Sequence, residues 1–419
     1  MFWHYIMQSM GLFHFWKKAP KRIYLDYAAN APVLPEVRAV MEPWLTEHYG
    51  NPSAIHKEGA RARDAIEMAR QSVARAFRVP EEGVVYTSGG TEANNLAITG
   101  SVEALRKEGK DYADLHIITT KIEHPSILRT LEMLEERGVY VSYVDVDEEG
   151  RIDRSSLEEH LRKETVLVTF AYVNSEIGTV QEVKHITRSV KKWNTEMDTD
   201  VRVHLDASQA PLWLRCSMDS LGVHLMTLDG GKCGGPAGSG ALLLGRGVKV
   251  APVLHGGSQE GGRRGGTENT ASILGCSHAL VRAQEGFEKR SERVARIRDA
   301  GIELLLNEVP GAVLNGPREN RVANNINISL PGYDSEFAVV TLDTHGVAAS
   351  TKSACGGADG SGSHVVRTVT GDEKRANATI RLSLGEETAL HELRSAAHIL
   401  KEYVARMRDV VKNIDSGVL

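Results

Sequence analysis

The stretch Leu225-Met-Thr-Leu-Asp-Gly-Gly-Lys-Cys-Gly-Gly-Pro-Ala-Gly-Ser-Gly240 places one lysine, Lys232, in a loop with six glycines. The apolar residues that begin the stretch and the run 241–244 that follows it are typical of short buried strands. Glycine permits positive φ and lets the backbone approach a ligand closely. A lysine held there can be partly desolvated, which lowers its pKa and makes it nucleophilic. Two interpretations are open: a lysine that forms a Schiff base with an aldehyde cofactor, and a surface lysine in a glycine-rich hairpin.

Strands and helices alternate on the amino-terminal side of this stretch. We predict strands at 23–25, 83–87, 115–120, 139–144, 166–173 and 201–205, and helices at 35–48, 56–77, 125–137, 155–163 and 183–193, with another after Glu92. This alternation predicts an α/β unit with a mostly parallel sheet. In such sheets ligands bind at the carboxyl ends of the strands. The polar residues at those ends are Thr87, Ser88, Thr91, Glu123, His124, Asn174, Asp206 and Gln209.

One of these strand ends has the form of an anion site. The strand ending at Thr87 passes through Ser88-Gly-Gly-Thr-Glu92, which contains Gly90 and Thr91, into a helix. A strand, a small turn and a helix together present free N–H groups and a positive dipole end to an anion. Phosphate is the ligand we expect, although a Ser or Thr at a helix start is also an ordinary cap.

The pattern changes after Gly275. We predict one long polar helix at 277–307, a strand at 325–330, a helix at 336–345, a strand at 379–384 and a helix at 390–411. Ser353-Ala-Cys355 leads into a glycine-rich loop at 356–364. We therefore predict a large α/β domain at 32–275 and a smaller α+β domain, formed by 21–31 and 276–419, that closes over it.

Composition narrows the class of protein. The 419 residues are 41% hydrophobic and 25% charged, as in an ordinary globular protein, and the net charge of −5 gives no general attraction to nucleic acid or anionic membranes. The four cysteines (Cys216, Cys233, Cys276, Cys355) form no CxxC pair and have no regular spacing. This argues against a disulfide framework or a metal site, and it favours a reducing compartment, the cytoplasm.

Residues 1–16 are rich in aromatic side chains. The segment is too short to span a bilayer as a helix and lacks the basic start and cleavage site of a signal peptide. We expect residues 1–20 to be a disordered or loosely docked extension. An upstream start-codon artefact and a membrane-surface anchor are the alternatives, and no other apolar run is long enough to span a membrane.

Four residues carry candidate chemistry, and each has two interpretations. Asp206 could pair with a protonated ring nitrogen of a cofactor or cap the next helix. His124 could stack on an aromatic ring and shuttle protons, or bond to backbone. Arg381 could bind a substrate carboxylate bidentately or form an internal salt bridge. Cys355, beside the glycine-rich loop, could be a reactive thiol or a structural one.

Taken together, the motifs resemble those of the cysteine desulfurases, pyridoxal phosphate-dependent enzymes of the class V aminotransferase type. The resemblance covers roughly residues 22–405. It rests on the segments 24–27, 50–53, 86–92, 123–124, 173–178, 204–209, 264–267, 353–355 and 380–385, together with Lys232. The glycine-rich loop after Cys355 is similar to that of the branch that supplies sulfur to iron–sulfur cluster assembly and tRNA thiolation.

The resemblance implies a fold-type I transferase with a mostly parallel seven-stranded sheet and a smaller α+β domain. Its substrate would be L-cysteine and its product L-alanine. Its partners would be a second copy of the chain and a sulfur-acceptor protein, which is either an iron–sulfur scaffold or a tRNA-thiolation enzyme. Direct contact with nucleic acid is not expected. By this resemblance, Lys232 would attach the cofactor and transfer protons, Asp206 would bind the pyridine nitrogen, and His124 would stack on the ring. Asn174 and Gln209 would contact the ring on its hydroxyl side, Gly90 and Thr91 would bind the phosphate, and Thr267 would reach the phosphate in the partner subunit. Arg381 and Asn174 would bind the substrate, and Cys355 would carry the persulfide.

Several positions depart from the family pattern. Where Asp229 and Gly231 stand, the family usually has a serine and a histidine that contact the phosphate. Two unit charges about 4 Å apart repel by roughly 4 kcal/mol at an effective dielectric constant of about 20. Because about 1.4 kcal/mol corresponds to a tenfold change in affinity, the affinity for the cofactor could fall by up to a thousandfold. The loss would be smaller if Asp229 rotates away, is protonated or is compensated by cations. Asn30 replaces a threonine. Lys352 replaces a glycine and could lower the thiol pKa of Cys355.

Three functions remain after this comparison. The first is an active cysteine desulfurase. The second is a pyridoxal phosphate-dependent lyase or transaminase acting on another amino acid, including selenocysteine, without need of Cys355. The third is a non-catalytic scaffold. Asp229 and Gly231 would explain it, and the intact Lys232, Asp206 and Cys355 argue against it. Cys233, a second thiol beside Lys232, is interpreted as structural.

Overall fold

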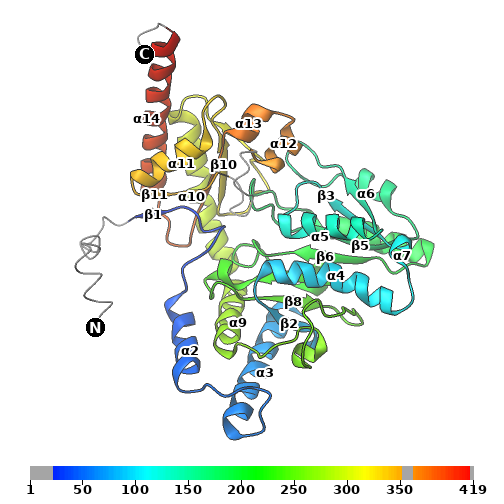
Figure 1. The fold of residues 1–419 in the computed structure, drawn as a ribbon. Coiled ribbons are helices and arrows are strands. Elements are labelled where there is room, and N and C mark those ends of the chain that lie inside the picture. The colour runs from blue at the N-terminus through cyan, green and yellow to red at the C-terminus, as the bar shows by residue number, and fades with distance from the viewer. Residues whose placement is uncertain (1–21, 352–361, 416–419) are drawn as a thin grey trace.

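The structure is a computed structural model that describes residues 22–351 and 362–415, with side chains described up to Arg408. The predictions for residues 1–20, Lys352 and Cys355 therefore lie outside the described residues. Figure 1 shows a large α/β part around one sheet and a smaller part beside helix α14 (Leu390–Asp415). Within the described ranges, no helix combines the length and apolarity needed to cross a bilayer.

The large sheet has seven strands in the order β2-β8-β7-β6-β5-β3-β4, and β8 is antiparallel to both of its neighbours while the other pairs are parallel. This confirms the mostly parallel sheet. The loop from β7 to β8 is too short for a crossover, so these two strands pair antiparallel. The strands are β2 (Val84–Thr87), β3 (His116–Thr120), β4 (Tyr140–Val144), β5 (Thr165–Ala171), β6 (Arg202–Asp206), β7 (Leu225–Asp229) and β8 (Gly240–Leu244).

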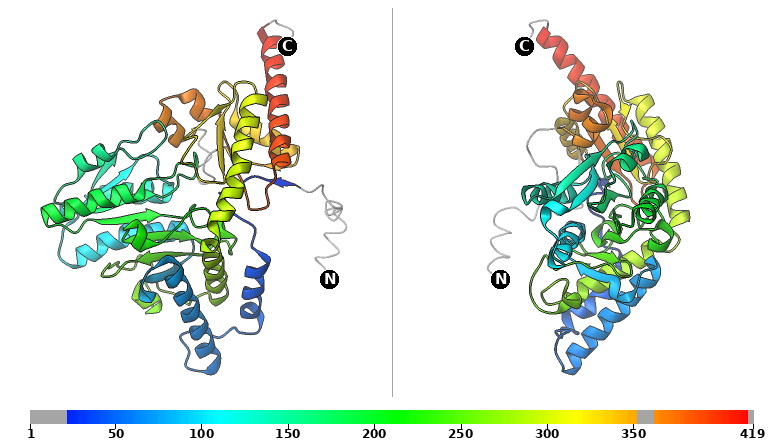
Figure 2. Two further views of the ribbon diagram at one scale, coloured as in Figure 1. Left: turned by 180° about the vertical axis from the view of Figure 1, so that it is seen from behind. Right: turned by 90° about the vertical axis from the view of Figure 1, so that its right-hand side faces the viewer.

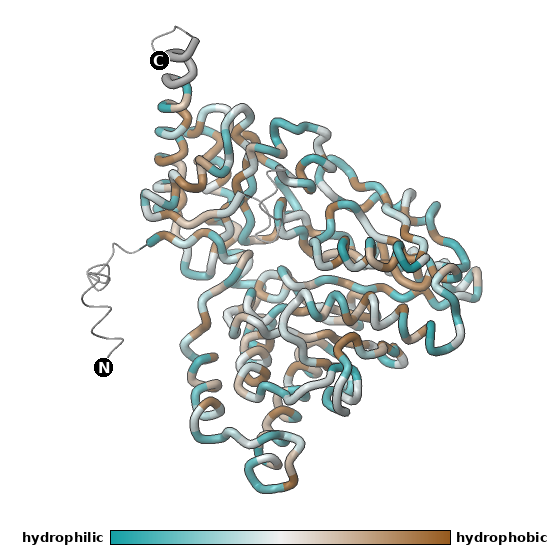
Figure 3. Tube along the Cα trace, viewed as in Figure 1, coloured by the Kyte–Doolittle hydropathy of each residue, from teal (hydrophilic) through white to brown (hydrophobic). Residues whose placement is uncertain are grey.

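Helices cover both faces of this sheet. Alternate residues of one strand point to opposite faces, so Val85 and Leu242 pack in the cluster of α4 and α5 while Val84 and Leu243 pack in that of α3, α7 and α9. Along the helices, hydrophobic and hydrophilic residues alternate, as expected for helices with one buried face (Figure 3). The helices of this part are α2 (Pro35–Thr46), α3 (Lys57–Phe77), α4 (Gly90–Lys107), α5 (Pro125–Glu136), α6 (Arg154–His160), α7 (Val183–Met197), α8 (Met218–Leu221) and α9 (Thr270–Gln284).

The smaller part contains an antiparallel sheet in the order β12-β10-β9, and a separate parallel pair in which β1, near the amino terminus, joins β11. Seen from behind, α10 runs beside α14 (Figure 2). The domain boundaries drawn from the sequence stay a prediction. The elements are β1 (Ile23–Tyr24), α10 (Phe287–Glu308), β9 (Val313–Leu314), β10 (Asn325–Ser329), α11 (Ser335–Thr344), β11 (Val347–Ala348), α12 (His364–Thr370), α13 (Glu373–Asn377) and β12 (Thr379–Ser383).

Two predictions about helices are wrong. The single helix at 277–307 is in fact α9 followed by α10, because Gly286 between them has φ 64° in the left-handed region and ends the helical path. The loop predicted to reach His364 ends earlier, since His364 is the first residue of α12. The short helices α12 and α13 were not expected from the sequence.

Candidate active site

Lys232 lies in a 3₁₀ turn, η4 (Gly230–Cys233), directly after β7. The backbone N–H of Gly230 donates to Ser239 (2.9 Å) and that of Gly235 donates to Gly230 (2.9 Å), which folds the glycine-rich loop onto itself. Only 20% of the Lys232 side chain is exposed. The interpretation as a surface lysine is therefore wrong.

The Lys232 side chain faces a cavity of about 170 Å³. The cavity lies between the carboxyl ends of the large sheet and strand β12, as expected for an α/β sheet. It brings together eight of the ten predicted site residues, which are Gly90, Thr91, His124, Asn174, Asp206, Gln209, Lys232 and Arg381.

Asp206 ends β6 and is 7% exposed. Its Oδ1 accepts from the backbone N–H of Ser208 (2.9 Å) and its Oδ2 from the Asn94 amide (2.8 Å). Burial disfavours the charged form, but Lys232 and these hydrogen bonds together hold the pKa of Asp206 below its usual value. The cavity therefore contains a buried, ionised carboxylate.

Asn94, on the buried side of α4, connects Asp206 to His124. Its Nδ2 donates both to Asp206 Oδ2 and to Ser126 Oγ (2.9 Å). Ser126 Oγ lies 2.8 Å from His124 Nδ1. Since the hydroxyl accepts from Asn94, its own proton is free to be donated to His124.

The hydrogen bonds of His124 fix its tautomer. The backbone N–H of Ser126 can only donate, and it points at His124 Nδ1 (3.1 Å). The neutral ring must therefore carry its proton on Nε2. Burial, together with the positive charge of Lys232, lowers the pKa of His124, which keeps the ring neutral near neutral pH. The preceding residue, Glu123, is fully buried, and burial raises its pKa to about 8.

Arg381 is 1% exposed and pairs internally with Asp26, as one of its two interpretations required. Its Nη2 donates to Asp26 Oδ1 (3.0 Å) and its Nη1 to the Ser175 carbonyl (3.0 Å). Its buried Nε has no hydrogen-bond partner among the described residues. Burial raises the pKa of Asp26, although the Arg381 guanidinium opposes the shift. The guanidinium thus combines a fixed orientation with unused donors beside the cavity.

Two amides of the predicted set are already partly bonded within the protein. Asn174 donates to the Ile122 carbonyl (2.9 Å), and its Oδ1 accepts from the N–H groups of Glu176 and Ile177 (3.0 Å each). Gln209 donates to the Ala28 carbonyl (2.9 Å). These bonds hold both side chains in place at the cavity wall.

At the amino end of α4, the carboxylate of Asp229 lies against the predicted phosphate site. Its Oδ2 is 3.3 Å from the backbone nitrogen of Gly90 and accepts its hydrogen bond, while its Oδ1 accepts from Gly231 (3.0 Å). The Lys232 ammonium is 4.0 Å from Asp229 Oδ2. Asp229 has therefore not rotated away from this helix end.

Of the two remaining predicted site residues, the structure describes only Thr267, which does not line this cavity. Thr267 is exposed and lines a separate cavity that also contains Ser88 and Arg264. Cys355 lies outside the described residues. Cys233, next to Lys232, is buried, and burial raises its thiol pKa well above the usual value, in agreement with a structural role.

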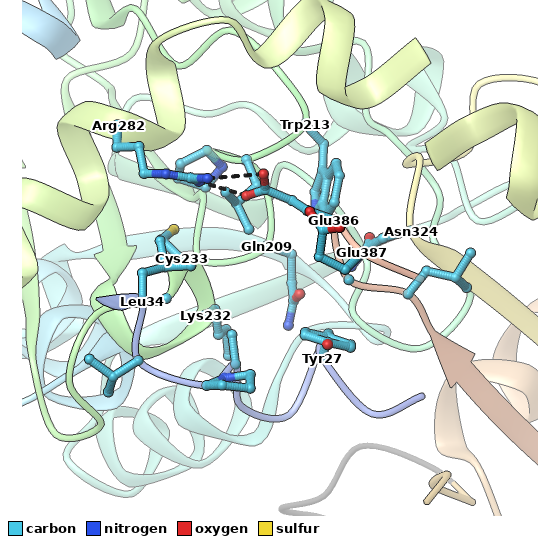
Figure 4. A pocket seen from close by; sticks show the side chains of 18 of the residues that line it. Tyr27, Leu34, Gln209, Trp213, Lys232, Cys233, Arg282, Asn324, Glu386 and Glu387 are labelled. Atoms are coloured by element: carbon cyan, nitrogen blue, oxygen red, sulfur yellow. Dashed lines mark hydrogen bonds and ion pairs between the residues drawn. The ribbon is translucent and has the colours of Figure 1, made fainter. Parts of the chain in front are cut away.

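A second cavity, of about 250 Å³, also has Lys232 in its wall (Figure 4). Gln209 also lines both cavities. The wall of the second cavity includes Trp213 and the ion pair between Arg282 and Glu386 (2.6 Å). The two cavities therefore share Lys232, Ser208 and Gln209 in their walls.

Sequence reasoning missed three residues that shape the site: Asn94, Ser126 and Asp26. Asn94 carried a detectable signal, because it is a polar residue one helical turn before Ala97 and Ile98 on the buried face of α4. Asp26 lies in the motif segment 24–27, but its partner Arg381 is distant in sequence, and Ser126 carried no comparable signal because it belongs to a helix cap.

Known proteins resemble this chain over most of its length. The family model described as aminotransferase class-V matches residues 23–394. Cysteine desulfurase IscS of Dictyoglomus turgidum is 38% identical over 93% of this chain and 96% of its own length. A solved structure titled NifS-like protein superimposes with a TM-score of 0.84 at 30% identity, covering 92% of this chain and 99% of its own. A structure titled "SspA in complex with cysteine" has a TM-score of 0.74 at 32% identity, covering 88% and 100%.

Proposed function

The chain belongs to the class-V aminotransferase family, and within that family we propose that it is a pyridoxal phosphate-dependent cysteine desulfurase, which converts L-cysteine to L-alanine and passes the sulfur on. The observation that carries this function is the single cavity that holds Lys232, Asp206, His124 and Arg381 together. The names of the relatives point to the same activity. They do not favour the alternatives of another amino-acid substrate or a non-catalytic scaffold.

The ring end of the cavity fits the cofactor. Asp206 is buried and ionised, and each of its oxygens accepts one hydrogen bond from the described residues, so lone pairs remain for a protonated ring nitrogen. The Lys232 amine reaches the same cavity and can hold the aldehyde carbon. When bound, pyridoxal phosphate would supply an electron-withdrawing ring that weakens bonds at the substrate's α carbon.

The protein's own groups orient the substrate and move protons. Arg381 would bind the cysteine carboxylate through its unused N–H groups, since its guanidinium is held by Asp26 and Ser175. His124 holds a proton on Nε2 and can donate it near the ring, while Nδ1 accepts the hydrogen bond of the Ser126 N–H. Lys232 can take the α proton of the substrate. It can then return a proton to the β carbon, which becomes the methyl group of alanine.

The proposal also covers the transfer of sulfur, the partners of the protein and its compartment. We propose that Cys355 Sγ forms an S–S bond with the substrate sulfur as the substrate's C–S bond breaks, leaving a persulfide and alanine. A second copy of the chain would supply Thr267 to the phosphate, which its exposed position permits. A sulfur-acceptor protein would take the persulfide sulfur. We place the protein in the cytoplasm, because Cys216, Cys233 and Cys276 are free thiols.

The absorption spectrum of the purified protein, recorded with and without added pyridoxal phosphate, tests the cofactor assignment. We expect a near-visible band that is lost in Lys232→Ala. Sulfide release from cysteine then tests the reaction, with Cys355→Ala as the variant and Cys233→Ala as its matched control. We expect Cys355→Ala to lose turnover at least about a hundredfold. Full turnover in that variant would favour a different lyase, and no band with excess cofactor would leave the scaffold.

A further inference from the structure

Three departures from the family pattern lie side by side in the structure. Asn30, Asp229 and Gly231 are separated by up to 201 positions in the sequence, yet an ideal Cβ on Gly231 would stand 3.0 Å from Asn30 Oδ1 and 3.4 Å from Asp229 Oδ1. The backbone N–H of Ala31 also donates to the Gly231 carbonyl (3.0 Å). The three residues therefore form one contiguous part of the cavity wall and its support.

This part of the site has a carboxylate where the cofactor's phosphate is expected. Asp229 Oδ2 takes the backbone donor of Gly90 at the start of α4, and an ideal Cβ on Gly90 would stand only 3.2 Å from that oxygen. The second oxygen is fixed by the N–H of Gly231. The carboxylate is thus anchored at both oxygens rather than free to swing into solvent.

Among the described residues, Asp229 has no positively charged ion-pair partner that stays available once the cofactor is bound. Lys232 is the only cation that forms an ion pair with Asp229 among the described residues. Its amine is the group reserved for the cofactor's aldehyde, so it cannot serve both purposes. The titratable groups that face Asp229 from the packed elements are Lys232 and Cys233 of η4, His124 at the start of α5, and Cys276 of α9.

We propose that Asp229 is a built-in competitor for the cofactor's phosphate group, so that this protein gains little affinity from the phosphate and holds its cofactor through Lys232 and Asp206. The inference rests on the proposed function. Cofactor phosphate and the Asp229 carboxylate claim the same Gly90 donor, and they repel each other in a partly buried cavity. The physical consequence is a cofactor that exchanges readily between the protein and solution.

Two ligands that differ only in the phosphate test this inference: pyridoxine 5′-phosphate and pyridoxine. Neither has an aldehyde, so calorimetry measures binding without attachment to Lys232. In the wild-type protein we expect the phosphate to improve affinity by less than about tenfold. In Asp229→Asn, which keeps the shape and removes the charge, affinity for pyridoxine 5′-phosphate should rise by roughly ten- to a thousandfold, while affinity for pyridoxine stays within about twofold.

Asp229→Ser, which restores the residue usual in the family, is the second variant and should change affinity in the same direction. Asp153→Asn is the matched control, because Asp153 also caps a helix by accepting backbone N–H groups, those of Ser155 and Ser156, but lies outside the cavity. It should leave both affinities unchanged. A wild-type protein that gains a hundredfold or more from the phosphate would overturn the inference. Absence of the Lys232-dependent absorption band with excess pyridoxal phosphate, in the wild type and in both Asp229 variants, would instead overturn the proposed function beneath it.

Discussion

At the scale of single residues, the site depends on side chains that hold the candidate catalytic and cofactor-binding residues in position. Asn94 shows this most directly, because one side-chain amide donates to both Asp206 and Ser126. Asp206 is expected to hold the ring nitrogen and Ser126 orients His124, so Asn94 positions two functions through one buried side chain. A sequence motif records the two chemical groups but not the amide between them.

Asn94→Ala should lower the free energy of unfolding by about 1–3 kcal/mol, because it removes a donor from the buried Asp206 carboxylate. Urea unfolding at neutral pH measures this change. Asn95→Ala is the control: Asn95 is partly exposed and bonds to Thr91 and Thr130, away from Asp206. Equal losses in the two variants would show that the bonds of Asn94 to Asp206 and Ser126 do not carry the effect.

At the scale of elements, the boundary between α9 and α10 shows how one backbone position divides a helix. The residues on either side have helical spacing, and for that reason the sequence predicted one helix. Gly286 has φ 64°, and the open space around its Cβ position means that backbone conformation, rather than packing, requires glycine there. The break lets α9 pack with α2 and α3 while α10 packs with α14.

Gly286→Val should destabilise the protein by about 1–2 kcal/mol, since a β-branched residue is strained at positive φ. Gly286→Asn should cost less, because asparagine tolerates the left-handed region better than other residues with a side chain. Thermal unfolding of both variants ranks the two costs. If asparagine and valine proved equally costly, the φ angle would not be the cause.

At the scale of the whole molecule, stability depends on polar groups buried between strands of the large sheet. His116 of β3 is fully buried, and its ring nitrogens bond to Thr165 of β5 and Ser142 of β4 (2.8 Å each). Burial lowers its pKa to about 4, with a smaller contribution from Arg162. The ring is thus held neutral across three adjacent strands of the sheet.

This burial predicts a loss of stability in acid. The unfolded chain binds a proton at His116 below about pH 6.5, while the folded protein does not until about pH 4, so stability is complete above that window and falls as the pH drops through it. Between pH 7 and pH 5 this residue should account for about 2 kcal/mol. Urea unfolding at both pH values should show a smaller drop for His116→Gln. His398→Gln, at a side chain that is 68% exposed, should match the wild type.

The amino-acid sequence by itself determined the order of elements, the mostly parallel sheet and most of the cavity. In β6 the apolar residues Val203 and Leu205 alternate with polar ones, and the polar Asp206 that ends the strand lies at the edge where ligands bind. Local patterns of this kind placed Asp206, His124 and Lys232 correctly at one site. They failed at Gly286 and at the short helices α12 and α13, where helical periodicity either continues through a break or covers too few residues.

Only the tertiary structure decided which distant residues meet. The pairs Asp26 with Arg381 and Asn30 with Gly231 depend on how β1 and the segment after it pack against the rest of the chain. The sequence shows that Asp229 departs from the family pattern. It does not show that the Asp229 carboxylate points toward Gly90, the first residue of α4. The physical reason is that a side chain's neighbours across the fold are set by the packing of whole elements, whereas sequence patterns report only which face of its own element is buried.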